Sequence, residues 1–432
     1  MNKLSNSHIV GVSLILLVYL AIGVLYAVNT PAWQAPDEPA HYNYIKHLAE
    51  HRSLPILELG DYDQKYISEV IKRGFPRDMS IDLLKYEAHQ PPLYYLLATP
   101  IFVVFDGSLL ALRLFSLIIG ACVILLFAIA TNLIFPGNLP ITLSVSGFVA
   151  FLPQHLAMMS SVNNDSMAEL CMILSLWLIM RRTKPWVIGI VVGLAFLAKV
   201  TVYVIVVVAT VAAVHRIQER EVRPFSLLQL LLPSLLIGAA WWLRNILVYG
   251  WPDLLGLINH SEVVVGQPRT VDWLAEFGAL GLSLRFIQTT FSSFWGQFGW
   301  MAVPMSPIVL RLLTILLIMV VMGNYMLFRL RVRSSNIDKL YWLVVLSTLS
   351  IVILQYIQYN VEFVQHQGRY LFPALLPFAL FYVAGLVGWS RYLENCWPNY
   401  SYVGCWLPVL YIPTMAILSV YTLYATIIPA FL

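Results

Sequence analysis

The sequence has 432 residues, of which 59% are hydrophobic and only 11% are charged, and its mean hydropathy is +0.77. A soluble domain would normally carry about a quarter charged residues, so this composition indicates an integral membrane protein. The net charge of +4 is too small to indicate a nucleic-acid partner, and no basic stretch alternates with stacking aromatic residues. The four cysteines have no metal-ligand spacing and lie outside the long polar loops, so neither a zinc site nor a disulfide framework is indicated.

Uniformly apolar runs dominate the chain from its first residues. A helix needs roughly 20 residues to span the hydrocarbon layer, and only helices and closed barrels satisfy their own backbone there. Because the runs do not alternate polar and apolar residues, we expect an all-α fold, a polytopic transmembrane helical bundle of about 11 spans. The first run has a signal-like start, but no small-residue cleavage site follows before Pro31, so we expect it to be retained. The candidate spans are residues 8–28, 109–133, 140–159, 166–180, 185–198, 200–214, 225–247, 307–328, 340–359, 370–388 and 403–428.

The segment Pro92–Phe105 is apolar but short for a span. Its helix would be about 21 Å long, against a hydrocarbon thickness of about 30 Å. If this segment only dips into the outer face, three basic clusters lie on the cytoplasmic side, as the positive-inside rule requires. The same rule predicts that residues 185–214 form two short helices that meet at Lys199 near the outer face. The clusters are Arg181-Arg182-Lys184, Arg216/Arg220/Arg223 and Arg329/Arg331/Arg333/Lys339.

This topology predicts a single domain, residues 1–432, with outer loops 29–108 and 248–305 and no soluble C-terminal domain. We expect a multi-pass protein of the plasma (inner) membrane, surrounded by membrane lipids, with an extracytoplasmic active site. Polar residues that could do chemistry then collect at the outer side of the membrane. They are Asp37, Glu38, His41, His89, Arg113, Asp165, Lys199, Arg244 and Arg369.

The first outer loop opens with the motif Pro36-Asp37-Glu38-Pro39-Ala40-His41. Apolar residues at helical spacing follow to about Glu50, which predicts a helix on the membrane surface whose first turn carries Asp37, Glu38 and His41. One interpretation is structural: Asp37 caps the helix, Glu38 favours its positive end, and His41 is an interfacial residue. The functional interpretation makes one carboxylate a general base on an acceptor hydroxyl or amine, while the other binds a cation or orients the acceptor.

Two further motifs place polar residues at the same side. The first loop returns through Tyr86-Glu87-Ala88-His89-Gln90, followed by Pro91-Pro92 at the start of the dipping helix. His89 is either a substrate-binding residue, for a donor phosphate or the acceptor, or a solvated helix-entry residue. Asp165 follows two asparagines at the outer mouth of a span, where a helix cap and a second acid of the site both fit.

The order of these motifs resembles the glycosyltransferase-C superfamily, which includes protein O-mannosyltransferases and the aminoarabinose transferases that modify lipid A. The likeness is closest to a largely uncharacterised bacterial family within it, and it extends from the first helix to about Pro373. Further matching stretches are Arg113-Leu-Phe-Ser-Leu117, Pro153 with Ser161-Val-Asn-Asn-Asp165, Gly193-Leu-Ala-Phe-Leu-Ala-Lys199, Trp242-Leu-Arg-Asn245 with Tyr249-Gly250, Phe294-Trp-Gly-Gln-Phe-Gly-Trp300 and Gln367-Gly-Arg-Tyr-Leu-Phe-Pro373.

The resemblance implies a polyprenyl-phosphate sugar as donor and inversion at the anomeric carbon of the sugar. It implies that Asp37 or Glu38 acts as base, and that Asp165 matches a second acid in the next outer loop. Some relatives need a divalent metal and others do not; this sequence has acids enough for one but no spacing that demands it, so we assign no metal ligand. Some relatives also carry a soluble C-terminal domain that helps to bind the acceptor, which we do not expect here.

Three basic residues are candidates for binding the donor phosphate. Lys199 has apolar residues on both sides, and charges at membrane depth tend to mark function, although its ammonium could also snorkel to the interface. Arg244 and Arg369 each begin or end a span on the outer side, where a guanidinium can grip a phosphate or anchor a helix end at the lipid head groups. For Arg113, at the start of its span, we favour the anchor.

We therefore expect an inverting glycosyltransferase that moves a sugar from a polyprenyl-phosphate donor to an extracytoplasmic glycan, lipid or protein. A transporter or flippase of a lipid-linked substrate is one alternative, and it predicts charges near mid-membrane and often an internal repeat. A polysaccharide polymerase or ligase would require an oligosaccharide donor. A non-catalytic scaffold would tolerate the loss of Asp37, Glu38 and Asp165.

Overall fold

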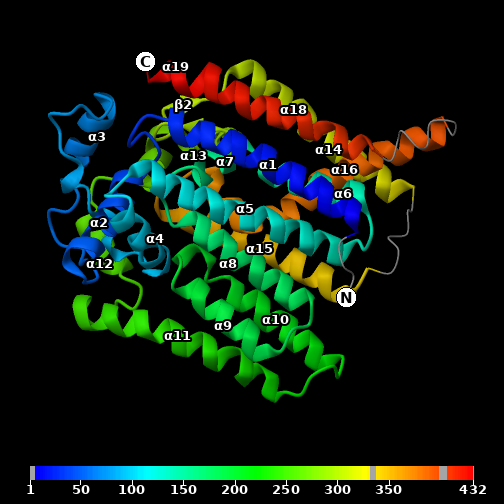
Figure 1. Ribbon diagram of the computed structural model, residues 1–432, viewed down its shortest axis with the longest axis horizontal. Helices are drawn as coiled ribbons and strands as arrows, with labels where there is room; N and C mark the ends of the chain where they lie inside the picture. The colour runs from blue at the N-terminus through cyan, green and yellow to red at the C-terminus, as the bar shows by residue number, and fades with distance from the viewer. Residues whose placement is uncertain (1–4, 331–336, 398–405, 432) are drawn as a thin grey trace.

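The computed structural model describes residues 5–330, 337–397 and 406–431, and helices are almost the only regular secondary structure of these residues, as expected (Figure 1). The first half contains α1 (Asn6–Asn29), α2 (Glu38–His51), α3 (Gln64–Lys72), η1 (Ile81–Leu83), η2 (Tyr86–His89), α4 (Leu93–Val104), α5 (Leu109–Ile134), α6 (Leu139–Ala150), α7 (Pro153–Met159), α8 (Asp165–Met180), α9 (Pro185–Phe196), η3 (Val200–Val202) and α10 (Ile205–Gln218). The second half contains α11 (Phe225–Tyr249), α12 (Leu257–Val263), α13 (Thr270–Trp295), β1 (Gln297–Phe298), β2 (Val303–Pro304), α14 (Pro307–Arg329), α15 (Lys339–Glu362), η4 (Gly368–Ala374), α16 (Leu375–Cys396), α18 (Leu407–Thr422), η6 (Leu423–Ile427) and α19 (Ile428–Ala430). The two short strands pair as an antiparallel hairpin.

Within the described residues, eight helical stretches are long and apolar enough to cross a membrane. A ninth results if α6 and α7, which are bent by 64° relative to each other, form one span. The remaining expected spans are helical but shorter, with 16 residues in α8 and 12 in α9. The polytopic helical bundle predicted from hydropathy is therefore confirmed. Arg331, Arg333 and positions 403–405 of the last expected span lie outside the described residues.

Two apolar helices are short, as expected, and each is slightly shorter than its predicted segment. Helix α4 contains 12 residues, which corresponds to a rise of about 18 Å, and Pro100 lies inside it. Helix α9 ends at Phe196, and Lys199 lies in the short break before η3, so the predicted interruption at Lys199 is confirmed.

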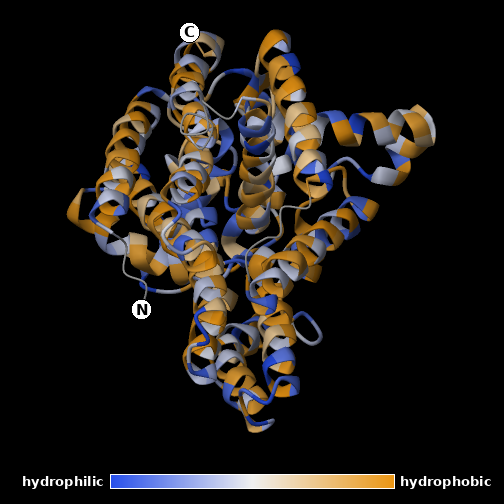
Figure 2. Cartoon of the chain, turned by 90° about the vertical axis from the view of Figure 1, so that its right-hand side faces the viewer, coloured by the Kyte–Doolittle hydropathy of each residue, from blue (hydrophilic) through white to orange (hydrophobic). Residues whose placement is uncertain are grey.

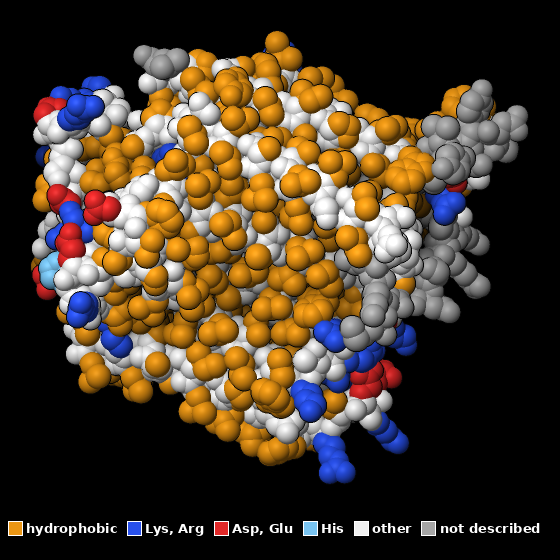
Figure 3. All heavy atoms as spheres, in the orientation of Figure 1, with side chains coloured by type: hydrophobic (Ala, Val, Ile, Leu, Met, Phe, Trp, Pro, Cys, Tyr) orange, Lys and Arg blue, Asp and Glu red, His pale blue; other side chains and the backbone are white. Residues whose placement is uncertain are grey.

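The segments that carry the basic clusters meet at one end of the bundle. The guanidinium of Arg182 forms ion pairs with Glu221, at 3.0 Å, and with Asp338, at 2.6 Å. Asp165 begins α8 and Arg182 follows its end, so the helix separates these two residues by about 24 Å. Figure 3 shows the same polarity on one face of the molecule, where charged side chains gather at opposite edges of a broad apolar surface. We call the end that carries α2, η2 and the start of α8 the Asp37 end.

Small residues bring α14 and α16 into close contact. A Cβ atom added to Gly323 would lie 1.9 Å from the carbonyl oxygen of Gly385, and one added to Gly388 would lie 1.9 Å from that of Gly323. In a lipid environment, such close backbone approach replaces the hydrophobic driving force that packs helices in water. Hydrophobic residues run along most of the helices (Figure 2).

The region 248–305, expected as an outer loop, contains a long helix that the sequence analysis missed. Helix α13 has 26 residues and is broken at Gly278, whose φ of 69° lies in the left-handed region that favours glycine. Val271, Leu280 and Leu284 on this helix are 58–76% exposed, so it presents an apolar surface outward.

Candidate active site

Asp37 lies immediately before α2 and does not cap it. Its backbone is left-handed, with φ of 64°, and its carboxylate makes no hydrogen bond to the first turn of the helix. Instead, Oδ1 accepts a hydrogen bond from the Tyr86 hydroxyl at 3.1 Å, and Oδ2 accepts one from Nη2 of Arg369 at 2.9 Å. The capping interpretation of Asp37 therefore does not hold, and the carboxylate faces η4 and η2.

The electrostatic environment keeps Asp37 ionised. Burial favours the neutral acid, but the positive charges of Arg369 and His41 and the hydrogen bonds from Arg369 and Tyr86 outweigh it, so the net pKa of Asp37 lies below its usual value. The side chain of Asp37 remains 26% exposed, which leaves it accessible to a ligand.

Asp165 and Lys199 form a second ion pair at the same end. Nζ of Lys199 lies 2.5 Å from Oδ1 of Asp165, and their side chains are 13% and 25% exposed, respectively. Helix α8 begins at Asp165, whose own N–H donates to Oδ1 of Asn163 at 2.9 Å. The predicted phosphate ligands Lys199 and Arg369 are thus each paired with a predicted catalytic acid.

His41 connects the two pairs electrostatically. Its Nδ1 lies 2.8 Å from the Tyr95 hydroxyl, and the side chain is buried. Burial lowers the pKa of His41, although the negative charges of Glu87, Asp37 and Asp165 oppose this shift. These interactions place His41 within electrostatic range of both ion pairs.

Glu38 has a structural environment that the sequence did not reveal. Its carboxylate is fully buried and accepts two hydrogen bonds from Arg113, at 2.8 Å to Nε and 2.6 Å to Nη2. The backbone N–H groups of Trp33 and Val162 also donate to it, at 3.1 and 3.2 Å. Arg113 is likewise buried and binds the carbonyls of Ala27, Thr30 and Pro31, so it ties α1 and α5 to the first loop and does not anchor the helix at lipid head groups.

His89 is buried against a second histidine. Its ring lies 4.3 Å from that of His260 in α12, and its Nδ1 bonds the Tyr86 carbonyl at 3.0 Å. Burial lowers the pKa of His89 to about 4, and burial together with the neighbouring His89 lowers the pKa of His260 to about 3. The pair joins the first loop to the 248–305 region, and it makes no hydrogen bond to Asp37 or Asp165.

Arg244 lies apart from the other two basic candidates. Its guanidinium donates to the Pro55 carbonyl and stacks on Trp241 and Tyr249, with ring distances of 4.9 and 5.1 Å. Among the described residues, none of its contacts is with Asp37, Asp165, Lys199 or Arg369. Arg244 therefore holds the first loop against α11.

Glu87 is an acid of this region that the sequence analysis did not single out. Among the described residues its buried Oε2 has no hydrogen-bond partner, and its carboxylate lies within electrostatic range of His41, Asp37 and Lys199. Burial raises the pKa of Glu87, and the charge of Asp37 adds to this effect. The sequence feature that could have identified Glu87 as a site residue is its position two residues before His89, in the same motif.

A further buried pair lies one turn deeper in the bundle. Nε2 of His155 in α7 is 2.8 Å from Oε2 of Glu169, which follows Asp165 by four residues on α8. Nδ1 of His155 has no partner among the described residues. This pair was not predicted, because both residues lie within segments expected to be spans.

The described residues bring together no group of three His, Cys, Asp or Glu side chains that could hold a metal ion. Asp37 and Asp165 are each already neutralised by a basic side chain. His89 and His260 are neutral imidazoles, the form that ligates metals, but they lack a third protein ligand of these types. The donor set therefore does not form a preformed metal site.

Comparisons with known proteins place the chain in a fold and a family. The fold is similar to that of the crystal structure of ArnT from Cupriavidus metallidurans bound to undecaprenyl phosphate, with a TM-score of 0.52, 12% identity, and coverage of 97% of this chain and 73% of that one. The apo state of the same ArnT gives a TM-score of 0.54 at 13% identity, with the same coverage. Archaeal oligosaccharyltransferase AglB from Archaeoglobus fulgidus, in complex with an inhibitory peptide and a dolichol-phosphate, gives 0.50 at 15% identity and covers 96% of this chain. The chain spans 55% of the length of AglB.

At these identities the likeness concerns the fold, which is the glycosyltransferase-C fold that the motifs predicted. No curated protein matches the sequence. Residues 81–377 match the family described as "Predicted membrane protein (DUF2142)", which is well over half of the chain. The chain therefore belongs to the DUF2142 family of predicted membrane proteins and has the glycosyltransferase-C fold.

Proposed function

We propose that the protein is an inverting glycosyltransferase that moves a sugar from a polyprenyl-phosphate donor to an extracytoplasmic acceptor. The observation that carries this proposal is that two carboxylates are each paired with a cationic side chain at one end of a glycosyltransferase-C fold. Asp37 is paired with Arg369, and Asp165 is paired with Lys199. Two proteins of similar fold are described in complex with undecaprenyl phosphate and dolichol-phosphate, which are polyprenyl phosphates.

Lys199 and Arg369 would bind the donor phosphate. An ammonium and a guanidinium in a partly buried site stabilise the charge that develops on a departing phosphate. The incoming phosphate competes with Asp37 for Arg369 and with Asp165 for Lys199. The ion pairs therefore hold the cations in place until the donor arrives.

Asp37 would act as the general base. The acceptor hydroxyl or amine gives its proton to the Asp37 carboxylate, its oxygen or nitrogen bonds to the anomeric carbon, and the bond from that carbon to the phosphate oxygen breaks on the opposite face. Engagement of Arg369 by the donor phosphate weakens its hold on Asp37, which raises the basicity of the carboxylate when it is needed. Asp165, His41 and Glu87 would position the acceptor and shape the local charge.

Glu38 and Arg244 have structural roles in this proposal. The Glu38 carboxylate is bound by Arg113, and the Arg244 guanidinium is bound to the Pro55 carbonyl. A divalent ion, which the resemblance implies for some relatives, has no preformed set of ligands here, so we derive no step through a metal.

The proposed binding of the donor phosphate is tested by native mass spectrometry of purified protein with undecaprenyl phosphate. We expect binding by the wild type and binding weaker by about tenfold or more in Lys199→Gln and in Arg369→Gln, since each loses a charge-assisted contact. Lys65→Gln is the matched control, because Lys65 is exposed in the first loop. Equal binding by all four proteins would show that the phosphate lies elsewhere.

A further inference from the structure

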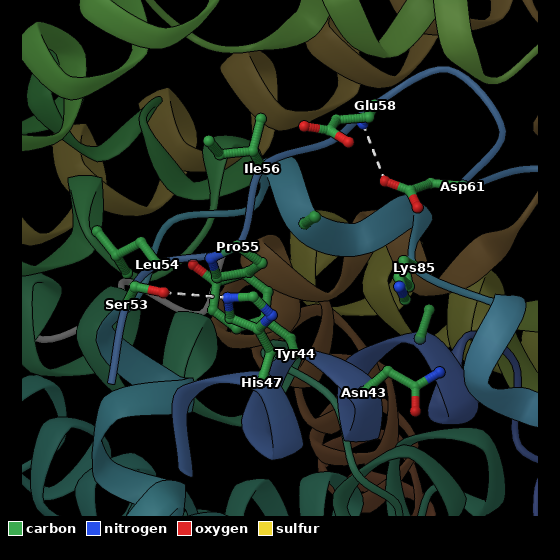
Figure 4. A pocket seen from close by; sticks show the side chains of 12 residues that line it. Asn43, Tyr44, His47, Ser53, Leu54, Pro55, Ile56, Glu58, Asp61 and Lys85 are labelled. Carbon is green, nitrogen blue, oxygen red and sulfur yellow. Dashed lines mark hydrogen bonds between the residues drawn. The ribbon is translucent and has the colours of Figure 1, made fainter. Parts of the chain in front are cut away.

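A cavity of about 290 Å³ lies beside the proposed active site, between α2, the segment 53–61 and η2 (Figure 4). This volume is close to the lower limit of small-molecule sites, about 300 Å³. Its polar lining comes from Asn43, His47, Ser53, Glu58, Asp61 and Lys85, and its apolar lining includes Leu54 and Pro55. None of these residues has a role in the proposed chemistry.

Several polar groups of the cavity lack partners among the described residues. The Lys85 ammonium and the Glu58 carboxylate make no ion pair or hydrogen bond, whereas the Asp61 carboxylate accepts one from the Glu58 N–H at 2.9 Å. The Asn43 amide donates both of its hydrogens, to the carbonyls of Ile81 and Leu84 at 2.6 and 2.9 Å. Its Oδ1 is left buried without a partner. A buried unpartnered acceptor costs free energy, which a ligand donor would recover.

The charges of the lining select against an anion. Glu58 and Asp61 supply two negative charges and Lys85 one positive charge. Burial and the nearby charges of His51 and Lys85 lower the pKa of His47, so its imidazole is neutral at pH 7. A phosphate or carboxylate would meet net negative charge here, whereas hydroxyl groups can donate to the carboxylates and accept from the ammonium. The lining therefore fits an uncharged polyhydroxylated molecule.

The cavity and Asp37 share two structural elements. Ala40, Tyr44 and His47 follow one another at spacings of four and three residues, which places them along one face of α2, and Asp37 immediately precedes this helix. Ala40, Tyr44 and His47 line the cavity. On the other wall, Lys85 lines the cavity and the next residue, Tyr86, donates its hydroxyl hydrogen bond to Asp37. A molecule held in the cavity is thus guided toward the carboxylate.

We propose that this cavity binds one ring of an uncharged saccharide acceptor, adjacent to the ring whose hydroxyl reaches Asp37. The inference rests on the proposed function and names the acceptor class for the same site.

The test measures saccharide binding to the purified full-length protein by saturation-transfer NMR. The probes are the methyl glycosides of glucose, galactose, mannose and N-acetylglucosamine and their linear trisaccharides, with glucose 6-phosphate and glucuronic acid as charged comparisons. Two variants alter the cavity. Glu58→Gln removes a negative charge from its lining, and Ser53→Trp fills the cavity from an exposed position. Glu69→Gln is the matched control, since Glu69 is exposed in α3 and outside the cavity.

We expect at least one uncharged saccharide to bind the wild type and the Glu69→Gln control, with binding weaker by about tenfold in both cavity variants. Binding that survives both cavity variants, binding restricted to the charged probes, or no binding of any probe would each overturn the inference. Hydrolysis of the lipid-linked donor by water needs no acceptor, so it should persist in Ser53→Trp. If the wild type does not hydrolyse the donor, the result counts against the proposed function. If the wild type hydrolyses the donor but binds no saccharide, the result counts only against the proposed saccharide site in the cavity.

Discussion

Asp37 and Glu38 are adjacent acids with opposite environments. The Glu38 side chain is completely buried and bound by Arg113, whereas that of Asp37 is 26% exposed and bound by Arg369. Glu38 is the first residue of α2, whereas Asp37 precedes the helix with a left-handed backbone, so the two neighbouring side chains face different surroundings. Which acid faces Arg113 depends on the packing of α5 against α1, and this packing could not be predicted from the motif.

Loss of the Glu38 charge should destabilise the protein. Glu38→Gln leaves Arg113 buried beside a neutral amide, and breaking a buried ion pair costs about 3–5 kcal/mol. We expect a lower midpoint of thermal unfolding in detergent and partial recovery in Glu38→Gln/Arg113→Met, which removes both charges. A Glu38→Gln protein that unfolds at the wild-type temperature yet is inactive would instead assign Glu38 a catalytic role.

The His89–His260 contact predicts a loss of stability in acid. The pKa of a histidine is about 6.5 in the unfolded chain, whereas burial lowers that of His89 to about 4 and that of His260 to about 3. The unfolded chain therefore binds more protons below pH 6.5, so the stabilisation is complete above this pH and declines as the pH falls toward 4 and 3. For His89 alone, the loss at pH 4.5 is about 2–3 kcal/mol.

This effect is measured as the difference in unfolding midpoint between pH 7.5 and pH 4.5. His260→Phe keeps a ring against His89 but removes one titrating group, so its decrease should be smaller than that of the wild type. His51→Phe, at an exposed position, is the control and should retain the wild-type decrease. Identical decreases in all three proteins would show that other groups determine the acid sensitivity.

At the scale of elements, uniform apolar runs predicted the bundle and polar breaks predicted its interruptions. The break at Lys199 and the helix after Asp37 followed from local sequence, because each has its own signal. Helix α13 was missed because its charged residues and the turn at Gly278 interrupt the apolar pattern. The joining of Lys199 to Asp165 depends on the packing of α8 beside α9, and the sequence shows only that both residues lie at the same side.

The contact between α14 and α16 should not tolerate a larger side chain. Gly323→Val would drive a side chain into the Gly385 backbone, and overpacking costs about 1–3 kcal/mol or more when backbone must move. We expect a lower unfolding midpoint and a poorer yield of folded protein. Val321→Ala, at a position on the same helix that is 51% exposed, should leave both quantities unchanged. An unchanged midpoint in Gly323→Val would show that the two helices can separate freely.

For the whole molecule, the ion pairs of Arg182 with Glu221 and Asp338 support the grouping of the basic segments that the positive-inside rule required. From this rule we propose that this end faces the cytoplasm and that the Asp37 end faces the outside. Single cysteines at Lys65 and Arg220, in a protein whose native cysteines are replaced, test the assignment. An impermeant maleimide should label Lys65→Cys in intact cells and Arg220→Cys only after permeabilisation. The reverse pattern would place the Asp37 site on the cytoplasmic side.

The most direct test of the account is the release of free polyprenyl phosphate from a panel of polyprenyl-phosphate sugars by purified protein, because slow transfer to water needs no known acceptor. We expect release from at least one sugar, and a rate lower by about 100-fold or more in Asp37→Asn, the range for loss of a general base. Glu69→Gln, an exposed acid in the same loop, should match the wild type. Release at equal rates by wild type and Asp37→Asn would contradict the assignment of Asp37 as the base.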